Sequence, residues 1–211
     1  MLAAWLAGPP AAASATGQPW GRVDALATGA TRPAPAGWLN HCMTDLAACQ
    51  PVDDAATVPA DQAHMALLTG IQHAVNRSIE PRREPPGQDL WSVAPRSGDC
   101  EDYALTKQRL LRLAGLPRRA VRLATVELPN GEEHVVLTVE TTRGTLVLDN
   151  LHAEVMHFNR LGYRWYAIEE PSLGLRWKEL RGGRSSPAAI LGYEGGMHRR
   201  ILPSAARAPD Q

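Results

Sequence analysis

The hydrophobic pattern of this chain changes its period near Gly115, and that change constrains the fold more than any other feature. From Asp99 to Gly115, one helical face carries apolar or small residues, with Lys107 as the exception. Gly115 and Pro117 stop the helix. Beyond them, apolar residues alternate with a period of two, which is typical of strands. A helix followed by an antiparallel meander predicts an α+β fold.

The same patterns place the other elements. An earlier helix is expected over residues 58–80, where apolar residues recur at helical spacing and a start signal lies at Pro59. Asp99 is the predicted N-cap of the helix that begins at Cys100, and acidic residues fill its first turn. Four strands are expected, at residues 121–126, 134–140, 145–149 and 163–168.

The 211 residues are enough for one domain with a substantial core. We expect it at residues 38–180, between a leader and linker at 1–37 and an irregular tail at 181–211. The apolar, alanine-rich start resembles a degenerate signal peptide, although its first basic residue is Arg22; a disordered leader is the alternative. No stretch reaches the roughly 18 apolar residues of a membrane helix, so stable membrane insertion is not expected.

Charge and cysteine content narrow the class of protein. The 22 basic and 22 acidic residues leave no net charge, which argues against a nucleic-acid-binding protein. Cys42 and Cys49 lie close together, whereas Cys100 stands alone. One interpretation is a disulfide and one reactive thiol, and the disulfide would imply an oxidising compartment such as the periplasm. Two buried, reduced thiols are the alternative for the pair.

Cys100 occupies a position suited to a nucleophile. It would be the first helical residue, where the helix dipole and free N–H groups stabilise a thiolate and can bind an oxyanion. Its neighbours Asp99, Glu101 and Asp102 oppose the thiolate, so an imidazolium or a bound cation is needed to offset them. The alternative is a small buried side chain packed under the helix.

His134 and Asp149 are expected to face each other across a hairpin. If the strands pair through the turn at 142–144, position 134 lies near position 149 or 151. A carboxylate there would hold one imidazole nitrogen and leave the other for Cys100, which is the arrangement of a catalytic triad. Taken singly, His134 reads as a histidine at a strand edge and Asp149 as a turn residue.

Several sequence runs together resemble the bacterial transglutaminase-like cysteine peptidases, among them the LapG-type proteases. The resemblance covers roughly residues 38–178, including Trp38, the Cys42/Cys49 pair and Asp89-x-Trp91. The runs that carry it are Gly98-Asp-Cys-Glu-Asp-Tyr-Ala-Leu-Thr-Lys107, Gly131-Glu-Glu-His134-Val-Val-Leu, Leu146-Val-Leu-Asp-Asn150 and, more weakly, Gly162-Tyr-Arg-Trp165.

The resemblance implies a papain-like or transglutaminase-like fold and a Cys100–His134–Asp149 triad. LapG-type relatives are periplasmic, cleave surface adhesins at a dialanine to release biofilm cells, and require calcium. The positions that match their calcium ligands are Asp99, Glu101 and Asp102. Acidic residues that only cap and solvate the helix start are the alternative.

Two departures from the family pattern leave the substrate open. The loop from Trp91 to Gly98 is short, and Glu132-Glu133 precede His134 where a small residue is common. The sequence thus predicts a cysteine peptidase acting on a cell-envelope or surface protein. Acyl transfer to an amine and a non-catalytic, calcium-sensitive binding module remain as alternatives. His152 and His157 lack companions for a metal site and are expected to be loop residues.

Overall fold

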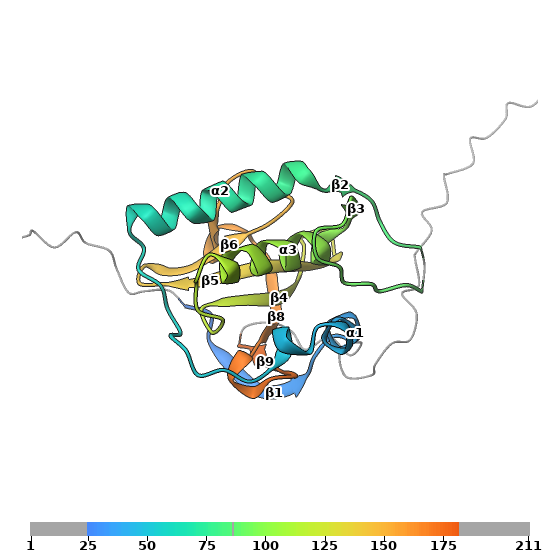
Figure 1. Cartoon of the computed structure of the whole chain (residues 1–211), viewed down its shortest axis with the longest axis horizontal. Helices are drawn as coiled ribbons and strands as arrows, with labels where there is room; N and C mark the ends of the chain where they lie inside the picture. Colours follow the sequence, from blue (N-terminus) through green and yellow to red (C-terminus); the bar gives the residue numbers. More distant parts are fainter. Residues whose placement is uncertain (1–24, 86, 182–211) are drawn as a thin grey trace, which may run out of the picture.

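The computed structural model describes residues 25–85 and 87–181, which form one antiparallel sheet covered by helices (Figure 1). The helices are α1 (Ala36–Thr44), α2 (Gln62–Ser78) and α3 (Cys100–Leu113), with a short 3-10 turn η1 (Leu46–Cys49) after α1. The strands of the main sheet are β1 (Thr28–Pro33), β4 (Val121–Glu127), β5 (Glu133–Thr141), β6 (Gly144–Leu148), β7 (Met156–His157), β8 (Arg164–Glu169) and β9 (Arg176–Leu180).

The seven strands lie in the order β1-β9-β8-β4-β5-β6-β7, and every neighbouring pair is antiparallel. Helix α3 packs on β4 and β5, and α2 packs on α3, so that α3 lies between α2 and the sheet (Figure 1). The α+β fold predicted from the change of period is confirmed.

Helix α3 is the centre of the larger core. Its apolar face, with Ala104, Leu105 and Leu111, contacts buried residues of β4 and β5 such as Leu123 and Leu137. Apolar side chains on both sides of this contact lose their exposure to water, which is the main favourable term in folding. A smaller cluster of buried side chains lies apart from this core: Ala124, Val126, Val136, Val147, Leu161, Trp165, Ile168 and Leu180.

The tryptophans that the structure describes are buried in the interior. Trp38 and Trp177 are 0% exposed, and their ring centroids lie 6.5 Å apart in an edge-on contact. Trp91 packs against Trp38 with ring centroids 6.2 Å apart. These rings join α1 and the loop before α3 to strand β9.

Two boundaries differ from the predicted ones. Helix α2 begins at Gln62 rather than near residue 58, because Asp61 is its N-cap and accepts a hydrogen bond from His64 N at 2.9 Å. The preceding Val58 instead bridges to Thr141 at the end of β5. Residues 28–37, assigned to the linker, form β1 and the beginning of α1. Residues 1–24 of the predicted leader and residues 182–211 of the tail lie outside the described residues.

Cys42 and Cys49 form a disulfide that joins α1 to η1, with their Cα atoms 5.7 Å apart. Two reduced thiols were the alternative for this pair. Within the described parts of the chain, no helix combines the length and apolar character needed to cross a bilayer.

Candidate active site

Two short strands position Cys100 at the start of α3. β2 (Glu80–Pro81), just after α2, pairs in parallel with β3 (Ser97–Gly98), just before α3. This pairing fixes the chain on both sides of the loop between them, and Cys100 follows as the first residue of α3. The predicted position of the cysteine at a helix start is therefore found.

The expected capping by the Asp99 side chain is wrong. Asp99 occupies the N-cap position, but its side chain makes no capping hydrogen bond; its Oδ2 instead accepts from Glu84 N at 3.3 Å. Its Oδ1 is buried and has no hydrogen-bond partner among the described residues. A buried carboxylate oxygen without a partner is costly, so this atom is available to a ligand or a proton.

Burial and a neighbouring carboxylate oppose the Cys100 thiolate that a helix start would favour. The Cys100 thiol is half-buried, and its Sγ donates to Glu101 Oε2 at 3.2 Å. Burial, followed by the charge of Glu101, raises the pKa of Cys100 well above its ordinary value, although a hydrogen bond from the backbone of Val135 lowers it. The Cys100 thiol therefore needs a general base or a bound cation to ionise.

His134 and Asp149 form a buried hydrogen-bonded pair. His134 Nε2 donates to Asp149 Oδ1 at 2.8 Å, and both side chains are buried. The hairpin pairs Leu137 with Leu148, which is one of the two registers predicted, and makes Asp149 a diagonal same-face neighbour of His134. With Nε2 engaged by Asp149, Nδ1 is the imidazole nitrogen left for another partner.

Asp149 is held in its ionised form by a set of donors. Leu151 N donates to Oδ1 at 2.9 Å and the Tyr163 hydroxyl donates to Oδ2 at 2.6 Å. Burial opposes ionisation, but the hydrogen bonds and charge of His134, with those of Leu151 and Tyr163, outweigh it and lower the pKa of Asp149. An anion here fixes one imidazole orientation and stabilises an imidazolium when it forms.

Helix α2 fixes the loop that carries Asp149. Gln72 Nε2 donates to the carbonyl oxygens of Asp149 and His152, both at 2.7 Å. Asn76 Nδ2 donates to the same two oxygens at 3.2 and 3.0 Å. The sequence did not point to these amides, because they lie on a helix 73 or more residues away from the loop they hold.

Two further side chains belong to this network. Tyr163 belongs to the motif Gly162-Tyr-Arg-Trp165, but no role was assigned to it. His152 lies in a loop, as expected, and its Nε2 lies 3.0 Å from the Tyr163 hydroxyl oxygen. Since Tyr163 donates its proton to Asp149, His152 is the donor in this contact. His157 lies in β7 and its Nδ1 has no partner among the described residues.

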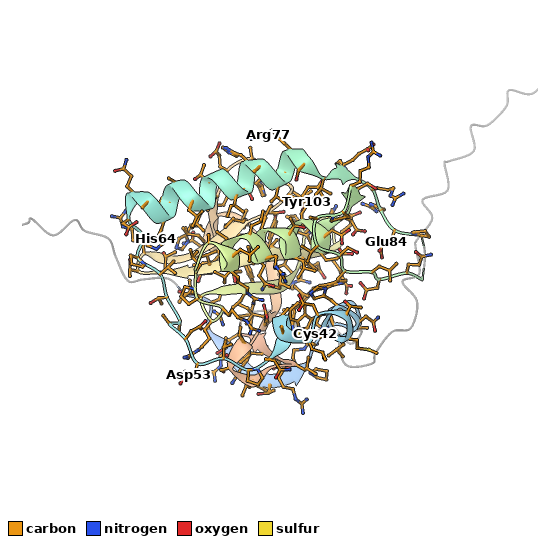
Figure 2. The ribbon with its side chains drawn as sticks, viewed as in Figure 1. Cys42, Asp53, His64, Arg77, Glu84 and Tyr103 are labelled. Atoms are coloured by element: carbon orange, nitrogen blue, oxygen red, sulfur yellow. A yellow bond between two sulfur atoms is a disulfide. The ribbon has the colours of Figure 1, made fainter. Side chains whose placement is uncertain are left out.

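The site opens onto a cleft of about 1140 Å³. Cys100 and His134 both line it, as do the loop from Pro81 to Asp89 and the turn at Gly131–Glu133. The backbone N–H of Val135, next to His134, also hydrogen-bonds the Cys100 sulfur. Figure 2 shows Glu84 on this loop beyond the end of α3, with Tyr103 between α2 and α3. The three predicted triad residues thus come from the first turn of α3, the start of β5 and the end of β6.

The three acidic residues implied as calcium ligands do not converge. Asp102 Oδ1 accepts from Ser92 N at 2.7 Å, and the backbone of Asp99 also hydrogen-bonds this carboxyl. Asp99 and Glu101 do approach each other: burial, then the hydrogen bond and charge of Asp99, raise the pKa of Glu101 to about 9. In the portion of the chain that the structure describes, no three His, Cys, Asp or Glu side chains gather closely enough to bind a metal ion.

Comparison with known proteins assigns the family. A family model described as bacterial transglutaminase-like cysteine proteinase, BTLCP, matches residues 28–185. The chain belongs to this family, and the predicted resemblance is confirmed. A search of curated proteins finds no match.

A solved structure supports the fold. Legionella pneumophila LapG in a calcium-bound form is 20% identical, with a TM-score of 0.50, and the match covers 64% of this chain and 77% of that one. An EGTA-treated form of the same protein is also 20% identical, with a TM-score of 0.46, over 52% of this chain and 64% of that one. At this identity the likeness concerns the fold alone.

Proposed function

We propose that this chain is a thiol peptidase in which Cys100 is the nucleophile, His134 the general base and Asp149 the residue that orients His134. The observation that carries the proposal is the buried His134–Asp149 hydrogen bond of 2.8 Å at the wall of a cleft that Cys100 also lines. Membership of a cysteine proteinase family supports it.

The proposed reaction begins with proton transfer from Cys100 Sγ to His134 Nδ1, because Nε2 is engaged by Asp149. The thiolate attacks the peptide carbonyl, and the backbone N–H of Cys100 at the helix start donates to the oxyanion. Collapse of the tetrahedral intermediate breaks the C–N bond, and His134 gives its proton to the leaving amine. Water, deprotonated by His134, then hydrolyses the thioester and restores the Cys100 thiol.

We infer that the substrate is a protein of the cell envelope or surface. The Cys42–Cys49 disulfide fits a protein exported to an oxidising compartment such as the periplasm. An adhesin is the substrate class that the family resemblance suggests. The catalytic domain would comprise residues 28–180, because β1 belongs to the same sheet as β9.

We infer that calcium supports the reaction through Asp99 and Glu101. Asp99 Oδ1 is buried without a partner and Glu101 lies beside it, so hard oxygen ligands are present, although Asp102 is engaged elsewhere. A calcium ion held there would neutralise the carboxylate charge that opposes a Cys100 thiolate. The calcium-bound form of Legionella LapG is consistent with this inference.

Hydrolysis of a denatured protein substrate by the wild type and by Cys100→Ala tests the proposal. Cys100→Ala should lose all turnover while keeping its thermal unfolding midpoint within a few degrees, because one half-buried sulfur is removed. Adding a primary amine distinguishes hydrolysis from acyl transfer by product mass. Full activity in Cys100→Ala would rule out the assignment, and no activity in the wild type, with and without calcium, would favour a binding module.

A further inference from the structure

Lys107 is a buried cation that the proposed reaction does not use. It lies on α3 seven residues after Cys100, two turns along the same face. Its side chain is 0% exposed, and its Nζ has no hydrogen-bond partner among the described residues. Burying an ammonium without a partner costs several kcal/mol, whereas an apolar side chain of the same length would fill the space at no such cost. Packing alone therefore does not account for a lysine here.

Asp149 is the charged group that acts on Lys107. Burial lowers the pKa of Lys107 to about 7, and the charge of Asp149 raises it. On α3 itself, the Tyr103 ring centroid lies 6.0 Å from Nζ, and the Tyr103 hydroxyl is engaged by the carbonyl oxygen of Ile79 at 2.6 Å. From α2, the neutral amides Gln72 and Asn76 bind the loop that carries Asp149.

Asp149 has other neighbours that can carry positive charge. His134 Nε2 is hydrogen-bonded to Oδ1, and His152 Nε2 lies 4.0 Å from Oδ2. Among the ion pairs of the described residues, none joins Lys107 to Asp149 within 4.0 Å, so these two charges act on each other through space. In a buried region such an interaction is only weakly screened.

We propose that Lys107 is a positioning residue whose fully buried ammonium favours the neutral imidazole of His134 in the resting site. This inference rests on the proposed function, in which neutral His134 takes a proton from Cys100. With Lys107 charged, the single negative charge of Asp149 is already offset by one cation, and a second cation on His134 is repelled by the first. His134 is then a free base until the thiolate or the oxyanion supplies a compensating negative charge.

Titration of the His134 imidazole by NMR tests this role. Cys100→Ala is compared with Cys100→Ala/Lys107→Met, so that no thiol titrates with the imidazole and Met replaces Lys at nearly equal length. We expect the pKa of His134 to rise by about 1 when the charge is removed, which is about tenfold in the ratio of protonated to neutral imidazole. The His134 signal is identified by its loss in Cys100→Ala/His134→Ala.

Gln108→Met is the matched control. Gln108 is the next residue on α3, is 1% exposed, and donates to Glu169 at 2.6 Å, away from Asp149. In the Cys100→Ala background it should leave the pKa of His134 unchanged. A second measurement follows the Cε signal of Lys107 in Cys100→Ala and Cys100→Ala/Asp149→Asn. The pKa of Lys107 should fall in the latter, and this measurement does not depend on the folding of Lys107→Met.

An unchanged pKa of His134 in a folded Lys107→Met protein overturns the role of Lys107, as does an unchanged pKa of Lys107 in Asp149→Asn. Peptide hydrolysis by the wild type is measured separately. Hydrolysis without a shift in the pKa of His134 refutes only the inference about Lys107. A shift in an enzyme that hydrolyses no protein refutes the peptidase proposal and leaves the electrostatic coupling standing.

Discussion

The two sides of the cleft differ in how completely their polar groups are satisfied. On the sheet side, Asp149 accepts from His134, Leu151 and Tyr163, and its pKa is lowered. On the helix side, Glu101 has a pKa raised to about 9, and Asp99 Oδ1 is buried without a described partner. The fold therefore holds the base, His134, in one orientation. Ionisation of the nucleophile, Cys100, depends instead on a group that binds, such as calcium, or on a neighbour that changes its charge, such as His134.

This difference has a physical origin in the covalent arrangement of the acids. Asp99 and Glu101 flank Cys100 in sequence, so their charges stay close to the sulfur whatever the helix does. Asp149, in contrast, follows the end of β6, where donors from the next turn (Leu151 N), from the residue before β8 (the Tyr163 hydroxyl) and from α2 (Gln72) converge on it. Such convergence stabilises one protonation state and one geometry of the base.

Among the variants that compare the two sides of the cleft, Asp149→Ala should produce the largest effect on hydrolysis, because it removes the acceptor on which the sheet side is organised. His134 loses its acceptor and the Tyr163 hydroxyl is left without its partner. We expect kcat/KM for peptide hydrolysis to fall by about 10²- to 10⁴-fold, the usual contribution of general acid–base catalysis. Asp149→Asn serves as the companion variant that keeps the shape and removes the charge. Unchanged hydrolysis in both variants would show that the pair has no part in the reaction.

Glu101→Gln tests the helix side of the cleft through the pH dependence of the free energy of unfolding. The folded-state pKa of Glu101, about 9, exceeds its ordinary value of 4.5, so the folded protein binds the extra proton and its stability falls as pH rises through this window. We expect the wild type to lose of the order of 2 kcal/mol between pH 6 and pH 9.

Urea unfolding at several pH values measures this loss. The slope should be absent in Glu101→Gln and reduced in the wild type by added calcium, which would take the place of the proton. A free energy of unfolding of the wild type that stays constant from pH 6 to pH 9 would contradict the raised pKa of Glu101.

Tyr163→Phe should have the smallest effect, since it removes one of three donors to Asp149. Loss of a hydrogen bond to a charged group costs about 1.5 kcal/mol, or about tenfold in kcat/KM. Tyr166→Phe is the matched control on β8, because its hydroxyl donates to Glu127 and not to Asp149. Equal effects of the two variants on kcat/KM would show that the hydrogen bond from Tyr163 to Asp149 does not contribute to the reaction.

The sequence predicted the parts of this site that local patterns determine. The position of Cys100 at a helix start followed from the helical period and the acidic first turn. The short turn at 142–144 reduced the hairpin register to two alternatives, one of which the structure has. The direction of the acidic side chains did not follow, because Asp99 and Asp102 are oriented by Glu84 N and Ser92 N from a loop without periodicity.

Long-range contacts account for what the sequence did not predict. β1 and β9 pair at the edge of the sheet through backbone hydrogen bonds, and Gly29 and Pro33 give β1 a weak strand pattern. Gln72 and Asn76 are polar residues on an amphipathic helix, where solvent exposure is the usual interpretation. Their contacts with the Asp149 loop arise only when α2 packs on α3.

The central claim is that His134, rather than the helix start, activates Cys100, and alkylation of Cys100 by iodoacetamide across pH tests it most directly. Cys100 is the one free cysteine, since the other two form the disulfide. We predict that the wild type reacts at neutral pH, about tenfold or more faster than His134→Ala. The variant should react only at pH values above the ordinary thiol pKa of 9.0, because burial and the charge of Glu101 still raise the pKa of Cys100. Identical pH profiles in the two proteins would contradict the account.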